Sequence, residues 1–200
     1  MSAFPIASAS RAIIAALLAS LSSCTALPDA DTPRSYLDES TAATVTVVGR
    51  PLVFARERPN FAVHMRDYIT LAAAAVDRTG TYDYILIAYF WTTFDPHARE
   101  GDVQGQRPDE VLILADDRRI RLVKADRSAH AAGIDEPVHA PTVGPGSAHV
   151  YRADPAMLRY IAAARTLRVR TLTGDMELNY DIWDDRRAAL AEWVRHLGGE

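Results

Sequence analysis

The sequence predicts a mostly β protein of the α+β class, an antiparallel sandwich or sheet of seven to nine strands covered by two helices. Runs of β-branched and aromatic residues recur between turn signals from residue 44 to residue 180. Short turns typical of hairpins join neighbouring runs. The helical patterns do not alternate with the strands, so nothing indicates the parallel sheet of an α/β protein.

The first strands are expected just after residue 43. Thr44–Val48 consists only of threonine and valine, residues that favour strands. The run 49–51 (Gly-Arg-Pro) interrupts it, and Leu52–Phe54 resumes the pattern. These residues predict two short strands separated by a break.

A long hairpin is expected in the middle of the chain. Tyr68–Val76 is rich in alanine, which suits a helix, but the turn signal at Asp77–Gly80 and the β-like run Tyr82–Phe94 favour a strand. Because the second arm is apolar on both faces, we expect a central strand covered on each side.

Two shorter hairpins are expected in the second half. One joins Val111–Ala115 to Arg119–Val123, where apolar and charged residues alternate. The other joins Leu167–Thr171 to Met176–Tyr180 through a Gly-Asp turn at 174–175.

Two helices have clear start signals. An aspartate at 154 before Pro155 predicts an N-cap and a helix to about Ala164. Asp184 and Asp185 are expected to open the last helix. Its apolar residues have the i, i+3, i+4, i+7 spacing of an amphipathic helix: Leu190, Trp193, Val194 and Leu197.

The N-terminus has the pattern of an export signal. Ala12–Leu21 is an apolar run of ten residues, which as a helix covers about 15 Å and is too short to span a bilayer. Such a run followed by small residues is typical of a signal peptide.

The residues after this run are more specific. Leu21-Ser22-Ser23-Cys24 resembles the lipobox of bacterial prolipoproteins, an aliphatic residue, two small residues and a cysteine. The resemblance implies cleavage before Cys24 and attachment of lipid to its thiol. Two or three acyl chains would anchor the protein stably at a membrane. The alternative is cleavage after Ala26, which would release a soluble protein without cysteine.

The resemblance also implies a location and a domain division. In proteobacterial lipoproteins an aspartate after the cysteine favours the inner membrane, so Thr25 favours the outer membrane of a Gram-negative bacterium. We expect a signal peptide at 1–23, a lipidated cysteine and flexible tether at 24–43, and a single globular β-rich domain at 44–200. Tyr36-Leu37 lies within this tether and is able to dock on the domain.

Charge and cysteine content limit the partners. The chain has a formal net charge of −4, and loss of residues 1–23 removes one arginine and no acid, so nucleic-acid binding is not expected. Lys124 is the only lysine. Cys24 is the only cysteine, so no disulfide stabilises the domain. No cofactor is indicated.

Candidate chemistry is sparse. The sequence lacks the G-x-S-x-G, H-E-x-x-H, phosphate-loop and C-x-x-C motifs. Histidines and acids could still meet at a metal in the loop-rich stretch 125–147, although their spacing matches no known ligand set and solvated or hydrogen-bonded histidines are the simpler interpretation. The histidines considered are His64, His97, His130, His139 and His149, of which the last three lie in or beside this stretch with Asp135 and Glu136. Separately, Asp95 with Asp102, or Asp135 with Glu136, could act as an acid/base pair as in glycoside hydrolysis, although acids in exposed loops are common.

Aromatic side chains offer another possible binding surface. Tyr82, Tyr84, Tyr89, Phe90 and Trp91 fall in one predicted strand, where they would line a ligand groove or, more simply, pack in the core and against neighbouring strands.

Two functions follow from the sequence. The favoured hypothesis is a non-catalytic accessory domain that binds an envelope protein or a cell-wall polymer. The alternative is a periplasmic or surface hydrolase, or a metal-binding enzyme, with its site in residues 125–149.

Overall fold

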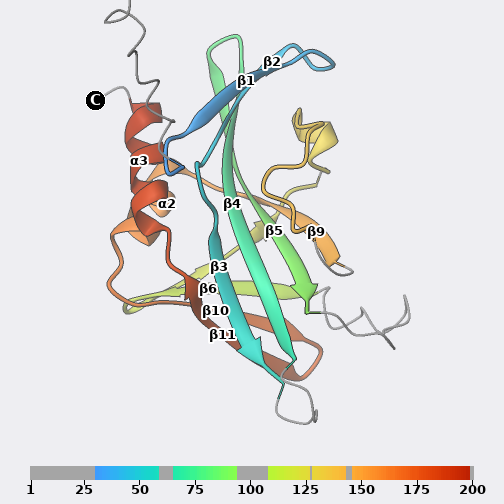
Figure 1. Ribbon diagram of the computed structural model, residues 1–200, viewed down its shortest axis with the longest axis vertical. Coiled ribbons are helices and arrows are strands. Elements are labelled where there is room, and N and C mark those ends of the chain that lie inside the picture. Colours follow the sequence, from blue (N-terminus) through green and yellow to red (C-terminus); the bar gives the residue numbers. More distant parts are fainter. Residues whose placement is uncertain (1–29, 59–64, 94–107, 127, 143–145, 199–200) are drawn as a thin grey trace, which may run out of the picture.

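The computed structural model describes residues 30–58, 65–93, 108–126, 128–142 and 146–198. Its strands are β1 (Arg34–Asp38), β2 (Ala43–Val47), β3 (Leu52–Glu57), β4 (Arg66–Arg78), β5 (Thr81–Thr92), β6 (Glu110–Ala115), β7 (Arg118–Arg121), β8 (Val123–Lys124), β9 (Gly146–Arg152), β10 (Leu167–Thr173) and β11 (Met176–Asp184). Two helices, α2 (Pro155–Ala163) and α3 (Arg187–Gly198), and a 3₁₀ turn, η3 (His130–Ala132), complete the described elements. The predicted class is confirmed (Figure 1).

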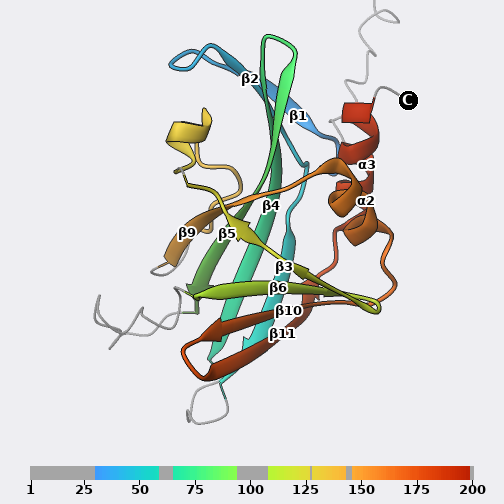
Figure 2. The same ribbon diagram turned by 180° about the vertical axis from the view of Figure 1, so that it is seen from behind.

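All strand pairs in the described residues are antiparallel, in the order β7-β6-β10-β11-β3-β4-β5-β9-β8, and β2 also pairs with β4. The sheet curls until it is nearly barrel-shaped, with β6, β10 and β11 crossing the lower half of the β4–β5 hairpin (Figure 2). Only Leu122 separates β7 from β8, so the chain passes directly from one edge of the sheet to the other. The eleven strands exceed the expected seven to nine because β1 adds one and the β7–β8 run is split.

The predicted long hairpin is confirmed as β4 and β5. Its turn is Thr79-Gly80, with φ values of 54° and 83°, and the Gly80 N–H donates to Asp77 at 2.8 Å. Two successive residues with positive φ are typical of a tight type I′ turn, in which glycine is unstrained. As predicted, β5 is central: it pairs with β4 on one edge and β9 on the other.

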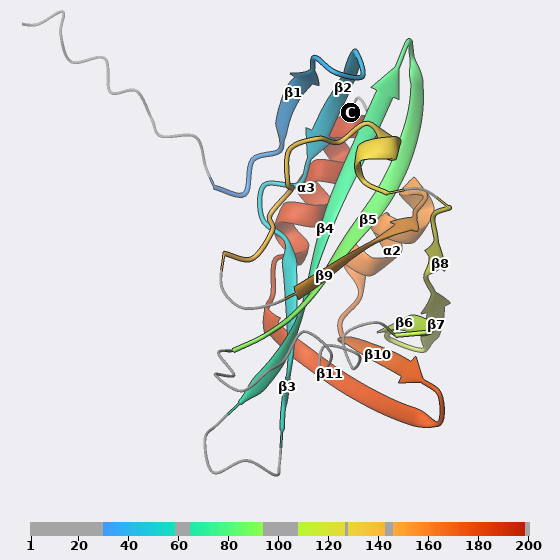
Figure 3. The same ribbon diagram turned by 90° about the vertical axis from the view of Figure 1, so that its right-hand side faces the viewer.

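The β4–β5 hairpin is buried on both faces. Its inner face contacts α2, α3 and the strands that curl toward them, in an inner cluster that includes Phe54, Ile69, Leu86, Phe90, Ile113, Leu158, Ile161, Val169 and Trp193. Its outer face belongs to an outer cluster made of Val45, Val47, Ala72, Ala74, Val76, Ile85, Ile87, Ile134, Val138 and Val150, among others. The helices lie on one side of the hairpin and the segment around η3 on the other (Figures 1 and 3). Four small alanines, Ala72–Ala75, allow both layers to approach closely.

Both helices form close to their start signals, although Asp184 ends β11 and α3 begins at Arg187, whose N–H donates to Asp185 at 3.2 Å. Asp154 caps α2 by accepting a hydrogen bond from the Met157 N–H at 2.8 Å, with proline in the first turn. In α3, Trp193 is fully buried and its indole N–H donates to the Thr46 carbonyl at 3.2 Å. The last helix therefore packs on the sheet, as the spacing of its apolar residues indicates. None of the described helices is long and apolar enough to cross a membrane.

The prediction of a flexible tether at 24–43 is wrong for the second half of that segment. Arg34–Asp38 forms β1 and pairs with β2 over its whole length, and Tyr36 packs against the outer cluster. Before it, the Asp31 backbone passes so close to Gly49 that a β-carbon there would lie 2.4 Å from the Asp31 carbonyl. The sequence of this segment resembles a polar tether because it has few apolar residues. It forms a strand because β2 pairs with it, and that pairing is not visible in the local sequence.

Candidate functional site

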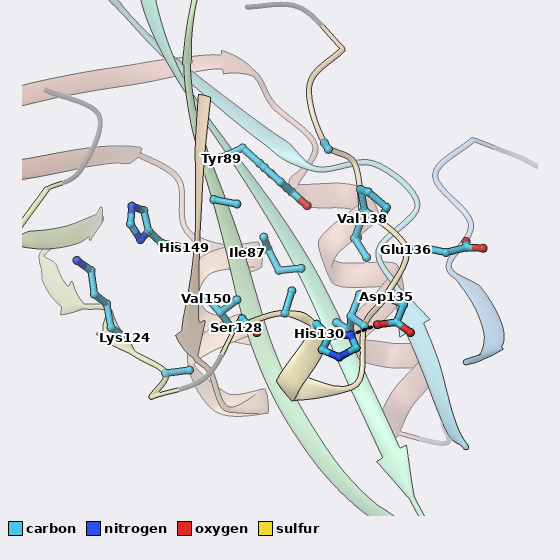
Figure 4. A pocket seen from close by; sticks show the side chains of 16 residues that line it. Ile87, Tyr89, Lys124, Ser128, His130, Asp135, Glu136, Val138, His149 and Val150 are labelled. Atoms are coloured by element: carbon cyan, nitrogen blue, oxygen red, sulfur yellow. Dashed lines mark hydrogen bonds and ion pairs between the residues drawn. The ribbon is translucent and has the colours of Figure 1, made fainter. Parts of the chain in front are cut away.

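A groove of about 610 Å³ lies on the outer face of β5 and β9, beneath the segment 128–142 (Figure 4). This volume is in the range of small-molecule binding clefts. The residues that define the groove are Ile87, Tyr89, Lys124, Ala125, Ser128, Ala129, His130, Ile134, Asp135, Glu136, Pro137, Val138, Ala140, Ala148, His149 and Val150. Twelve of these sixteen residues belong to the segment 125–149 that the alternative hypothesis singled out.

The floor of the groove is apolar. Ile87 and Val150 face each other across the β5–β9 ladder and are buried, while Ala148 is exposed. Tyr89 pairs with Ala148, and burial raises the pKa of Tyr89 to about 12, although a hydrogen bond with the Val138 backbone acts in the opposite direction. The floor therefore offers apolar contact and a neutral phenol.

The wall of the groove is fastened at several points to strands that are distant in sequence. The Arg78 guanidinium donates to the Ala132 carbonyl at 2.8 Å. His139 donates from Nε2 to the Val48 carbonyl at 2.6 Å, and burial lowers the pKa of this imidazole. Ile134 and Val138 insert into the outer cluster. The segment is thus a packed wall on the sheet.

A polar network joins this wall to the β1–β2 turn. The Asp38 carboxylate accepts hydrogen bonds from the backbone N–H groups of Ser40, Thr41 and Asp135, at 3.1, 3.1 and 3.0 Å. The Ser40 hydroxyl also donates to it at 2.7 Å, and these donors, Ser40 first, lower the pKa of Asp38 to about 2. Asp38 is therefore an anion that holds the wall in place.

Asp135 has a comparable set of donors. Its carboxylate contacts the Ser40 hydroxyl and the Nδ1 of His130, and these two hydrogen bonds, Ser40 first, lower the pKa of Asp135. Ser40, Asp135 and His130 are the residue types of a hydrolytic triad, but the carboxylate lies between the hydroxyl and the imidazole. In an acyl-transfer triad the imidazole occupies that position and takes the hydroxyl proton. The contacts of this trio hold the loop together.

The candidate histidines do not converge. His130 contacts Asp135, His139 contacts Val48, and His149 lies against the Phe90 ring on the other face of the sheet, with 5.6 Å between ring centroids. Among the described residues no three histidine, cysteine, aspartate or glutamate side chains are grouped as metal ligands. Of the acid pairs, Asp135 and Glu136 lie in the groove. Outside the described residues lie Cys24, His64, Asp95, His97 and Asp102.

The sequence left two interpretations for the aromatic residues of β5, a ligand groove or packing in the core, and the structure divides these residues between them. Phe90 belongs to the inner cluster and Tyr84 meets Trp193 edge to face. Trp91 stacks on Tyr68 across the strand pair, with 4.2 Å between centroids, whereas Tyr82 is exposed. Tyr89 alone of these five lines the groove.

Sequence reasoning missed Asp38 and Ser40, which bind the wall of the groove at Asp135, and Lys124, which lies at the edge of the groove. Asp38-Glu39-Ser40 has the pattern of an Asx turn, in which an aspartate accepts from the backbone two residues later. That signal identifies the turn, but not the contact between Asp38 and residue 135. Lys124 is notable in sequence only as the single lysine.

No protein-family model, no curated protein and no solved structure matches this chain.

Proposed function

We propose that the protein is a lipid-anchored protein of the cell envelope whose β-rich domain binds a ligand or partner, without catalysis, in the groove between β5, β9 and the segment 128–142. The observation that carries this proposal is the groove itself, with its apolar floor and its fastened polar wall. A few polar groups around an apolar floor are typical of binding sites.

The N-terminal segment supports a position close to the membrane. Asp31 packs against Gly49 and pairs with Arg50 at 3.5 Å, so only seven peptide steps separate the domain from Cys24. Seven steps of about 3.5 Å span at most about 25 Å. With Cys24 lipidated, the domain would remain near the membrane surface, and its partner would be found there. We place the protein at the outer membrane of a Gram-negative bacterium.

The arrangement of Ser40, Asp135 and His130 supports binding over acyl transfer, because within the described part of the chain the Ser40 hydroxyl contacts carboxylates and no imidazole. The alternative, a hydrolase or metal-binding enzyme, draws on the same segment, since His130 and Asp135 both line the groove. It remains the competing hypothesis in the experiment below.

In-cell photocrosslinking tests the proposal. A photoreactive residue at Ala148, which is exposed in the groove, is compared with one at Ala156, an exposed alanine on α2. We expect a discrete adduct from position 148, none from position 156, and loss of the adduct when Cys24→Ala prevents anchoring. Identical adducts from both positions, or none from 148, would contradict the proposal and direct attention to metal analysis and hydrolase assays.

A further inference from the structure

A cleft separate from the groove lies between α2 and α3. It consists of two adjoining hollows of about 380 and 190 Å³, which share Arg159, Val194 and Gly198 as lining residues. The floor of the larger hollow is made of small side chains, those of Ala162, Ala163 and Ala191. Since most of its lining residues are exposed, the cleft opens to solvent, and a ligand can approach the helix backbones closely.

Two arginines line this cleft, and their charge is only partly neutralised. Arg195 pairs with Glu192 on the same helix. Arg159 has no ion pair with any residue that the structure describes, whereas most arginines of the domain do have one, as Arg168 does with Asp181. The cleft is therefore positive, although the chain as a whole has a net charge of −4. The planar N–H groups of arginine match the oxygens of a phosphate group.

The chain enters the domain beside α3. Asp31 packs against Gly49 and pairs with Arg50, and Arg50 lines the same small internal cavity as Leu190 of α3. β1, which follows Asp31, lies near α3 (Figures 1 and 3). A helix with its side chains is about 10–12 Å across, whereas the seven peptide steps from Cys24 span up to about 25 Å. Cys24 can therefore reach past α3 to the side on which the cleft opens.

We propose that the cleft between α2 and α3 binds the phosphate headgroup of a bilayer phospholipid, so that the helix pair rests on the membrane that holds Cys24. This inference rests on the proposed function, because it requires the lipid anchor. The helices and the segment around η3 lie on opposite sides of the β4–β5 hairpin (Figure 3). Docking through the helices therefore turns the groove toward the aqueous phase, where a partner can enter it.

Fluorescence quenching of the full lipidated protein in vesicles tests this inference. Because Cys24 is the only native cysteine and its thiol carries lipid, an introduced cysteine takes a label uniquely. The label is placed at Ala188→Cys, on the exposed side of α3 one turn before Ala191, or at Asp175→Cys, in the exposed turn between β10 and β11.

The vesicles differ in whether their lipids carry phosphate. Vesicles of phosphatidylcholine and phosphatidylglycerol with a trace of nitroxide-labelled lipid should quench the label at position 188 and not the label at position 175. Vesicles of digalactosyldiacylglycerol, a bilayer lipid without phosphate, should quench neither label.

Substitutions in and beside the cleft should change docking in opposite directions. Arg159→Gln should lower the ratio of docked to undocked domain about fivefold, the usual contribution of one basic residue at an anionic lipid surface. Glu192→Gln should raise this ratio, because it frees Arg195 from its acidic partner. Arg121→Gln, at an exposed arginine of β7, is the matched control and should leave the ratio unchanged. Circular dichroism checks that each variant is folded.

Three results would overturn the inference. The first is equal quenching at positions 188 and 175, or none at 188, because the helix pair then does not face the bilayer. The second is quenching that neither Arg159→Gln nor Glu192→Gln alters, because the contact then does not use the cleft. The third is a change in label emission when glycerol phosphate is added, without quenching by lipid, which would assign the cleft to a soluble phosphate.

The proposed function has separate readouts. Intact mass tests whether Cys24 carries lipid, and crosslinking from position 148 tests the groove. An adduct from position 148 without quenching at position 188 would retain the proposed function and reject this inference. An unlipidated Cys24 would contradict both.

Discussion

The backbone N–H of Asp135 donates to the carboxylate of Asp38 at 3.0 Å, across 97 positions of sequence. This bond joins the first strand of the domain to the wall of the groove. It makes the geometry of the candidate site dependent on a segment that sequence alone assigns to a tether.

Asp38→Asn should loosen this wall and lower the melting temperature by a few degrees. An amide accepts fewer and weaker hydrogen bonds than the carboxylate, which holds three backbone N–H groups. Hydrogen exchange at residues 132–138 should become faster, while exchange in β10 stays unchanged. Glu39→Gln, at the neighbouring exposed acid, is the control. Unchanged exchange in the Asp38 variant would mean that the apolar contacts of Ile134 and Val138 suffice.

The lowered pKa of the Asp38 carboxylate predicts that the stability of the groove wall depends on pH. The folded pKa of Asp38, about 2, lies below its ordinary value of 3.8, so its stabilising contribution is complete above about pH 4 and is lost as the pH falls toward 2. The lowered pKa of Asp135 acts in the same direction. Exchange of the wall should therefore accelerate between pH 4 and 2 in the wild type. A similar acid response in Asp38→Asn would assign it to other groups.

Trp193→Ala should lower the free energy of unfolding by about 3–5 kcal/mol, the usual range for a large buried aromatic. Trp193 is fully buried, touches Tyr84 and donates to Thr46. Urea unfolding provides the measurement. Trp183→Ala, at a tryptophan that is 56% exposed, is the matched control and should change stability by no more than about 0.5 kcal/mol. Equal effects would show that α3 does not contribute to the core.

Gly49→Ala should detach the start of the domain from the sheet. A β-carbon at this position would lie 2.4 Å from the Asp31 backbone, so the segment must move. We expect faster proteolysis between residues 30 and 34 and a longer effective tether. At Gly198 a β-carbon meets nothing within 4 Å, and Gly198→Ala should have no such effect. An unchanged cleavage pattern at 30–34 would contradict the close packing of Asp31.

Cys24→Ala should abolish lipid attachment. We expect the uncleaved precursor, or a soluble product if cleavage occurs after Ala26. Fractionation and intact mass measure both. Mature-sized protein that remains in the membrane fraction would refute the lipobox.

Local signals predicted most of the strands and both helices. The turn at Thr79-Gly80 and the cap at Asp154 act within a few residues, so their effect is visible in sequence. The alanine-rich run 68–76 was assigned correctly as a strand because a turn and an apolar strand follow it. By contrast, β1 is polar and short, and it is a strand because β2 pairs with it.

The sequence alone determined the fold class, the central hairpin and the position of both helices, and it predicts the lipid anchor at Cys24. Only the tertiary structure decided that β7 and β8 lie at the two edges of the sheet, that Asp38 meets Asp135, and that β5, β9 and the segment 128–142 enclose one groove. The physical reason is the distance along the chain over which each kind of interaction acts. Backbone propensity and capping act over a few residues, whereas the groove depends on contacts between segments that come together only when the sheet curls and its two apolar faces are covered.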